Sequence, residues 1–171
     1  VLYLRDFNRL TFANGVLSRG PAQADTLSAL SQLFTETGAQ DPVFLGASLG
    51  AIGAVDLGLK LNINRILAFG YLDRTRSDDR WRLGDSRAPV LAAREHLIAN
   101  GQVPSLQTHL AAANRSVPID LFYNPVNSID SYYARIFAGL PQARLHAVGA
   151  GRSHDALRPV LLNGQLDTFL S

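Results

Sequence analysis

The sequence predicts an α/β fold, with a mainly parallel β-sheet and helices on both of its faces. Short apolar segments typical of buried strands alternate with segments whose apolar residues recur at helical spacing. Strands that alternate with helices of about 10–15 residues form βαβ units with right-handed crossovers. The chain has 171 residues and shows neither an internal repeat nor a domain boundary. We therefore expect one domain over residues 1–171.

The first part of the chain shows this alternation clearly. Leu27, Leu30, Leu33 and Phe34 fall at helical spacing, and Gly38 follows them as a helix terminator. A short apolar segment and a stretch rich in small residues come next. The expected elements are a strand at Val1–Arg5, a loop at Asp6–Gly20, a helix at Ala22–Thr37, a strand at Val43–Ala47 and a helix at Leu49–Leu61.

The second part repeats the alternation after a polar interruption. Residues Tyr71–Arg87 are rich in Arg and Asp and predict a loop. The longer stretch Tyr71–Val117 is the expected cap or insertion. The expected strands are Arg65–Gly70, Val117–Tyr123 and Arg144–Val148, and the expected helices are Ala88–Asn100, Ser105–Asn114, Ser128–Gly139 and His154–Leu170, the last with a break near Asn163-Gly164.

The first residues predict a strand without any lead-in. The chain contains no Met and begins directly with the apolar segment Val1–Leu4. We therefore expect that the sequence is truncated and that one or two further strands precede it. A longer reading frame that encodes such strands would be the evidence for this expectation.

Composition and charge exclude several classes of protein. Hydrophobic residues make up 47% and charged residues 18% of the chain, which indicates a globular protein. A net charge of +2 with scattered Arg gives no reason to expect nucleic acid or an anionic membrane as a partner. The lack of Cys excludes disulfides, a thiolate nucleophile and Cys-ligated zinc. Neither a membrane-spanning run nor a signal peptide is evident, so we expect a cytoplasmic protein.

Residues 46–50, Gly-Ala-Ser-Leu-Gly, carry the most informative motif, G-x-S-x-G. Between a strand and a helix, this motif forms a sharp turn that exposes the Oγ of Ser48 as a nucleophile. The backbone N–H of Leu49, at the helix N-terminus, is the expected donor to an oxyanion. Gly46 and Gly50 fit a turn in which a Cβ would clash. The alternative is an ordinary βα turn without catalysis, in which a phosphate could bind.

A nucleophilic serine needs a base, and His154 is the expected one. It follows the last predicted strand and the flexible stretch 149–153, and it opens the predicted last helix. A loop at the carboxyl edge of the sheet would carry it to the serine. His146 lies within a strand, where packing explains it, whereas His96 and His109 fall in the predicted insertion, where surface positions explain them.

Asp130 is the expected acid that orients this base. It follows the strand Val117–Tyr123, and one helix and one strand separate it from His154. The alternative role for Asp130 is a helix cap. Asp73, just past an earlier strand, is the main rival for the acid, and Asp120 lies inside a strand where it is poorly aimed.

The strand–G-x-S-x-G–helix unit, followed by Asp130 and then His154-Asp155, resembles the α/β-hydrolase superfamily over most of the chain. The resemblance implies a hydrolase fold and a catalytic triad of Ser48, Asp130 and His154. The chain departs from the family pattern because no His-Gly or Gly-Gly pair follows the first strand. The second oxyanion donor is therefore expected among the backbone N–H groups of Arg5–Phe7.

A narrower likeness is to small bacterial α/β hydrolases found beside the glycosyltransferases of polysaccharide biosynthesis. Short matches near both ends and in the predicted insertion carry it. They are Arg5-Asp6 with Arg9, Asp79-Arg80-Trp81, and His154-Asp155 with Asn163-Gly164-Gln165-Leu166.

The predicted function is that of a serine esterase or deacylase acting on a small acyl ester or an O-acylated sugar. Arg5, Arg9, Arg80 and Trp81 are expected to line its pocket, because Trp stacks on sugar faces and Arg pairs with anionic groups. The alternative for these four residues is a solvated loop with a single core Trp. No metal or cofactor is expected, since the histidines lack ligand spacing. The alternative function is a non-catalytic accessory module that binds a protein or a saccharide.

Overall fold

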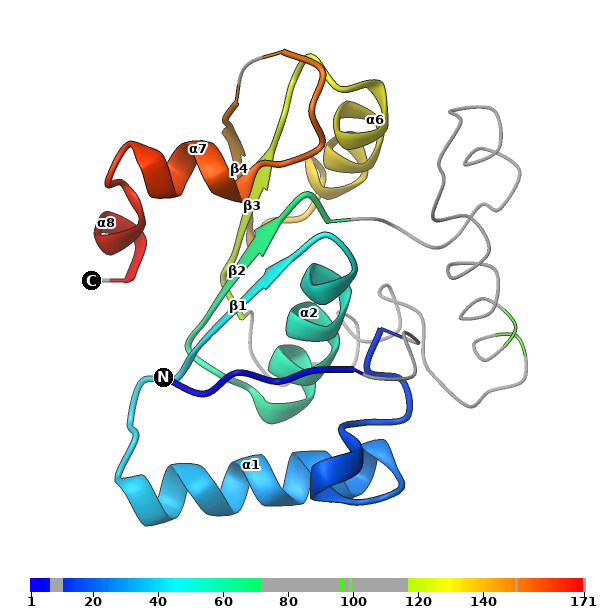
Figure 1. Ribbon diagram of the computed structural model, residues 1–171, viewed down its shortest axis with the longest axis vertical. Coiled ribbons are helices and arrows are strands. Elements are labelled where there is room, and N and C mark those ends of the chain that lie inside the picture. Colours follow the sequence, from blue (N-terminus) through cyan, green and yellow to red (C-terminus); the bar gives the residue numbers. More distant parts are fainter. Residues whose placement is uncertain (7–10, 72–95, 97–98, 100–116, 150, 171) are drawn as a thin grey trace.

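The computed structural model describes residues 1–6, 11–71, 96, 99, 117–149 and 151–170 (Figure 1). Within these residues, parallel strands form a four-stranded sheet in the order β1-β2-β3-β4. The α/β fold with a parallel sheet that the alternation predicts is therefore confirmed. The strands are β1 (Val43–Ala47), β2 (Arg65–Phe69), β3 (Ile119–Tyr123) and β4 (Ala143–Ala147).

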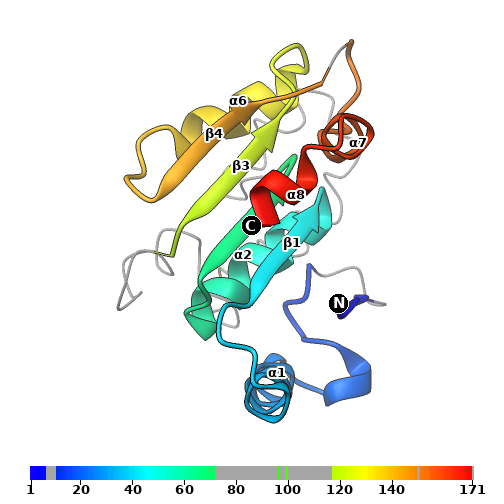
Figure 2. The same cartoon turned by 90° about the vertical axis from the view of Figure 1, so that its left-hand side faces the viewer.

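Helices cover both faces of the sheet, as the sequence predicts. Figures 1 and 2 show α2 and α6 on one face and α7 and α8 on the other. None of the described helices is long and apolar enough to cross a bilayer. The helical elements are the short 3₁₀-helix η1 (Leu17–Arg19), α1 (Gln23–Thr37), α2 (Leu49–Leu61), α6 (Ser128–Phe137), α7 (Leu157–Leu162) and α8 (Leu166–Leu170).

Alternating side chains of the central strands divide the core into two layers. In β2, Ile66 and Ala68 pack in the layer that contains α2 and α6, whereas Leu67 and Phe69 pack in the layer that contains α7. All four are buried, as expected for a parallel strand covered on both faces. The outer strand β1 differs, because Leu45 is 41% exposed. The centre of the sheet is thus covered on both faces, whereas β1 leaves Leu45 exposed.

A charged cluster lies on the α8 side of the sheet. The buried carboxylate of Asp120 accepts a hydrogen bond from Arg65 Nε at 2.8 Å and bonds His146 Nε2 at 2.7 Å. Arg65 Nη1 also donates to the carbonyl oxygen of Phe169 in α8 at 2.8 Å. The Phe169 ring packs edge-on against Phe122 in β3. The cluster therefore ties the C-terminal helix to the sheet.

Most predicted elements are confirmed to within two residues, but three differ. Val1–Arg5 forms no strand in the structure, and Val1 and Tyr3 are exposed. A β-prone sequence becomes a strand only where a neighbouring strand pairs with it. The predicted loop Asp6–Gly20 contains η1, and the last helical segment begins at Leu157 rather than at His154. The predicted helices Ala88–Asn100 and Ser105–Asn114, and most of the stretch Tyr71–Val117, lie outside the described residues.

We expect Asp120→Ala to lower the free energy of unfolding by about 3 kcal/mol, since it leaves the half-buried Arg65 and His146 without their carboxylate. Urea unfolding followed by circular dichroism measures this change. Asp167→Ala, an exposed carboxylate in α8, is the matched control and should change stability by less than about 0.5 kcal/mol. Equal stability of the two variants would contradict this role for the cluster.

Candidate active site

Ser48 occupies the turn between β1 and α2 in a strained backbone conformation. Its φ of 53° and ψ of −121° lie outside the regions that L-residues ordinarily adopt. Such strain persists only where the surroundings enforce it, and it is concentrated at functional sites. Here the backbone N–H of Ser48 donates to the carbonyl oxygen of Phe69 at 2.8 Å, which fastens the turn to β2.

Close packing within the turn explains one of its two glycines. A Cβ on Gly46 would lie 2.3 Å from the carbonyl oxygen of Gly50, so only glycine fits there. A Cβ on Gly50 would meet no atom within 4 Å, so the expected clash at that position is wrong. The close approach between the first turn of α2 and β1 therefore requires glycine at position 46 but not at position 50.

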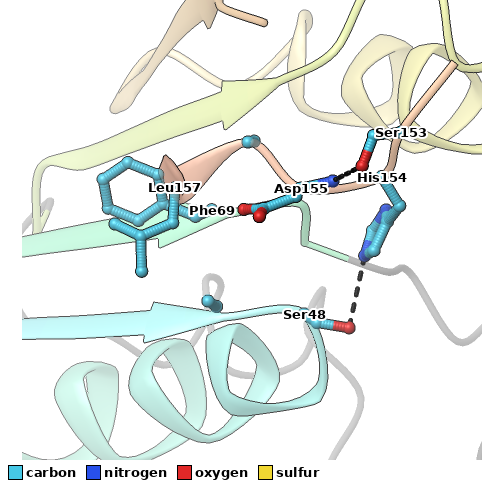
Figure 3. A pocket seen from close by; sticks show the side chains of 8 residues that line it. Ser48, Phe69, Ser153, His154, Asp155 and Leu157 are labelled. Atoms are coloured by element: carbon cyan, nitrogen blue, oxygen red, sulfur yellow. Dashed lines mark hydrogen bonds between the residues drawn. The ribbon is translucent and has the colours of Figure 1, made fainter. Parts of the chain in front are cut away.

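His154 reaches Ser48 from the loop between β4 and α7 (Figure 3). The distance from His154 Nε2 to Ser48 Oγ is 3.2 Å. The two residues stand 106 positions apart in the sequence. The structure thus brings the predicted base within hydrogen-bond distance of the predicted nucleophile. The His154 side chain is 26% exposed, so the pair can be reached from solvent.

Asp130 completes the chain of hydrogen bonds from the opposite side of the imidazole. Its Oδ1 bonds His154 Nδ1, and its Oδ2 accepts from the backbone N–H of Asn124 at 3.1 Å. In the tautomer that is protonated at Nδ1, the imidazole donates to Asp130 and Nε2 accepts from the serine hydroxyl. The side chain of Asp130 is fully buried, which shields this bond from water.

Asn127, and not Asp130, is the residue that caps helix α6. Asn127 is the N-cap of α6, and its Oδ1 accepts from the backbone N–H groups of Ile129 at 3.0 Å and Asp130 at 3.1 Å. The carboxylate of Asp130 is therefore available to His154.

The other histidines and acids have different surroundings. His146 bonds the buried Asp120 and stacks on Phe122, and His96 is exposed. His109 and the rival acid Asp73 lie outside the described residues. Among the described residues, no group of three or more His, Cys, Asp or Glu side chains is placed to hold a metal ion.

Leu49, the expected oxyanion donor, lies at the N-terminus of α2, and its role stays a prediction. Leu49 is the first residue of α2, where the N–H groups have no partner within the helix. A donor among Arg5–Phe7 stays a prediction. Asp6 turns its carboxylate to the N–H of Phe12 at 2.8 Å, and Phe7 lies outside the described residues.

A cavity of about 350 Å³ opens beside Ser48 and His154. Figure 3 shows that Phe69 and Leu157 form its apolar side, opposite the serine hydroxyl. The exposed Arg5 is not among the lining residues, and Arg9, Arg80 and Trp81 lie outside the described residues. Among the residues that the structure describes, the lining residues are Ala47, Ser48, Phe69, Ser153, His154, Asp155, Ala156 and Leu157.

Two residues that the sequence analysis did not single out also shape the site. A Cβ on Gly70 would lie 2.8 Å from Cε1 of His154, so the imidazole lies against bare backbone. Asn124, at the end of β3, bonds both the Asp130 carboxylate and the loop that carries His154. Gly70 is the last residue of one predicted strand and Asn124 directly follows another, and this position at a strand end was the available signal.

No protein-family model matches the chain, and no curated protein is significantly similar to it. The assignment of the site therefore depends on the geometry of Ser48, His154 and Asp130.

The two glycines of the motif give a matched pair of variants. We expect Gly46→Ala to lower the free energy of unfolding by about 2–3 kcal/mol, because its Cβ would overlap the Gly50 carbonyl. Gly50→Ala should leave stability unchanged or raise it by up to about 1 kcal/mol, since Ala is the better helix former. Urea titration of both variants measures the difference, and equal destabilisation would contradict the packing described for this turn.

Proposed function

We propose that the protein is a serine hydrolase that cleaves carboxylic esters through an acyl-enzyme. One observation carries the proposal, namely the hydrogen-bonded series Ser48 Oγ, His154 Nε2, His154 Nδ1 and Asp130. A nucleophile beside a base that a buried acid orients is the arrangement that acyl transfer requires. The strained turn and the helix N-terminus at Ser48 support the same chemistry.

In the first half of the reaction, Ser48 Oγ bonds to the ester carbonyl carbon while its proton passes to His154 Nε2. The carbonyl electron pair moves onto oxygen, where the N–H of Leu49 stabilises the negative charge. The tetrahedral intermediate then collapses, the bond to the alcohol breaks, and the alcohol takes the proton from Nε2. An acyl group remains on Ser48.

In the second half, His154 Nε2 takes a proton from water, whose oxygen bonds to the acyl carbon. Collapse breaks the bond to Ser48 Oγ, which regains the proton, and the acid product leaves. Throughout, Asp130 accepts the hydrogen bond from Nδ1–H of His154, and its negative charge stabilises the imidazolium. Its burial strengthens this interaction, because little solvent screens it.

The cavity favours a small acyl or alkyl group next to the scissile bond. Phe69, Ala156 and Leu157 give it an apolar side, whereas Ser153 and Asp155 give it polar groups. Acetylated or otherwise short-acylated compounds are therefore the first substrates to test. An O-acylated saccharide belongs to this class, and it is the substrate that the narrower family likeness favours.

A fluorophosphonate probe tests the proposal directly, because it reacts covalently with activated serines. We expect the wild-type protein to be labelled, and Ser48→Ala and His154→Ala to lose labelling by at least about 100-fold. Ser28→Ala, an exposed serine of α1, is the control and should label as the wild type does. A folded wild-type protein that resists labelling would refute the proposal and favour the accessory-module alternative.

Asp130→Asn should lower kcat on a p-nitrophenyl ester by about 10³-fold or more, with KM changed little. The amide cannot hold the Nδ1 proton of His154 in the required tautomer, although it has nearly the same shape. Asp167→Asn, on the exposed side of α8, is the matched control. Full activity of Asp130→Asn would show that a different acid orients the base.

A further inference from the structure

The loop that carries His154 has little regular structure of its own. It runs from the end of β4 to the start of α7. Gly149 and Gly151 take positive φ angles of 96° and 73°, and Gly151 and Ser153 are exposed. Glycine adopts many backbone conformations, so this loop has many conformations available to it. Contacts with the rest of the protein must therefore stabilise the native conformation.

Those contacts come from the side chain of Asn124. Its Nδ2 donates to the carbonyl oxygens of Gly151 at 3.1 Å and Ser153 at 2.6 Å. Its Oδ1 accepts from the backbone N–H of Val126 at 3.0 Å, which fixes the orientation of the carboxamide. Asn124 is 1% exposed, so water competes little for these bonds.

The backbone of the same residue holds the acid. The N–H of Asn124 donates to Asp130 Oδ2, on the carboxylate whose other oxygen bonds His154. Asn124 therefore contacts the acid through its main chain and the loop of the base through its side chain. A second carboxamide, that of Asn127, donates to the carbonyl oxygen of Arg152 at 3.0 Å, but it is more exposed.

We infer that Asn124 is a positioning residue, which sets His154 at the correct distance from both Asp130 and Ser48. The inference rests on the proposed hydrolase function. Only a carboxamide of this length offers two N–H donors to the loop and an acceptor to its own turn. The contact from His154 to Ser48 is already 3.2 Å, so a further shift of about 1 Å would break it and slow the reaction about 100-fold.

Asn124→Asp is the sharpest test, because it keeps the shape and the Oδ1 acceptor but turns an oxygen towards two carbonyl oxygens. Asn124→Ala removes the donors without adding charge near Asp130. Ser131→Ala is the control, since it removes a hydrogen bond from α6 to the carbonyl oxygen of Pro125, next to Asn124, at 2.9 Å and leaves the His154 loop untouched. Thermal unfolding identifies any loss of the fold.

The measurements are kcat and KM for p-nitrophenyl acetate, the fluorophosphonate labelling rate, and the proton resonance of the Asp130–His154 hydrogen bond. We expect both Asn124 variants to lose kcat and labelling rate by about 10- to 100-fold, with KM within about threefold. The hydrogen-bonded Nδ1 proton should shift or broaden. Ser131→Ala should match the wild type in all three measurements.

Each other outcome is decisive. Active wild type with unchanged Asn124 variants would overturn this inference and leave the proposed function standing. Loss of folding in both variants would also overturn it, because Asn124 would then serve the fold rather than the placement of His154. A wild-type protein that neither labels nor cleaves the ester would refute the proposed function itself.

Discussion

Parallel alignment of the strands is the constraint on which the candidate site depends. The carboxyl ends of parallel strands lie at one edge of a sheet, and ligands bind outside that edge in open α/β folds. Ser48 follows β1, Asp130 follows β3 and His154 follows β4. Parallel pairing of the strands therefore brings three segments that are far apart in the sequence to the same edge of the sheet. The two covered faces of β2 and β3 hold this edge in place.

Local patterns explain why much of the fold was predictable from sequence. The strands β1 to β3 are short, mainly apolar segments, α1 keeps its apolar residues at helical spacing, and α2 is a stretch rich in small and apolar residues. The turn at Ser48 is also local, since strand, motif and helix are contiguous. The N-terminal segment Val1–Arg5 was predicted wrongly, because strand formation depends on a partner that propensity does not reveal.

The site was predictable only where a residue's role follows from its place in the chain. Chain order and the ends of strands indicated His154, but Asp130 had a rival in Asp73 and an alternative role as a cap. The cap is Asn127. Sequence alone does not show whether Asn127 or Asp130 bonds the first N–H groups of the helix, because that depends on the orientation of their side chains. Asn124 and Gly70 act through contacts with the distant loop that carries His154, so their place at strand ends hints at the site but does not reveal these contacts.

Two His–Asp pairs in this protein show why residue types alone do not define a site. His146 lies in a strand, stacked on Phe122, and its carboxylate partner Asp120 is shared with Arg65, so the pair belongs to a closed structural cluster. His154 lies in a loop, bonds its acid through Nδ1, and presents Nε2 to Ser48 beside a cavity. The placement of the second imidazole, rather than its acid partner, is what makes proton transfer from a nucleophile to the base geometrically possible.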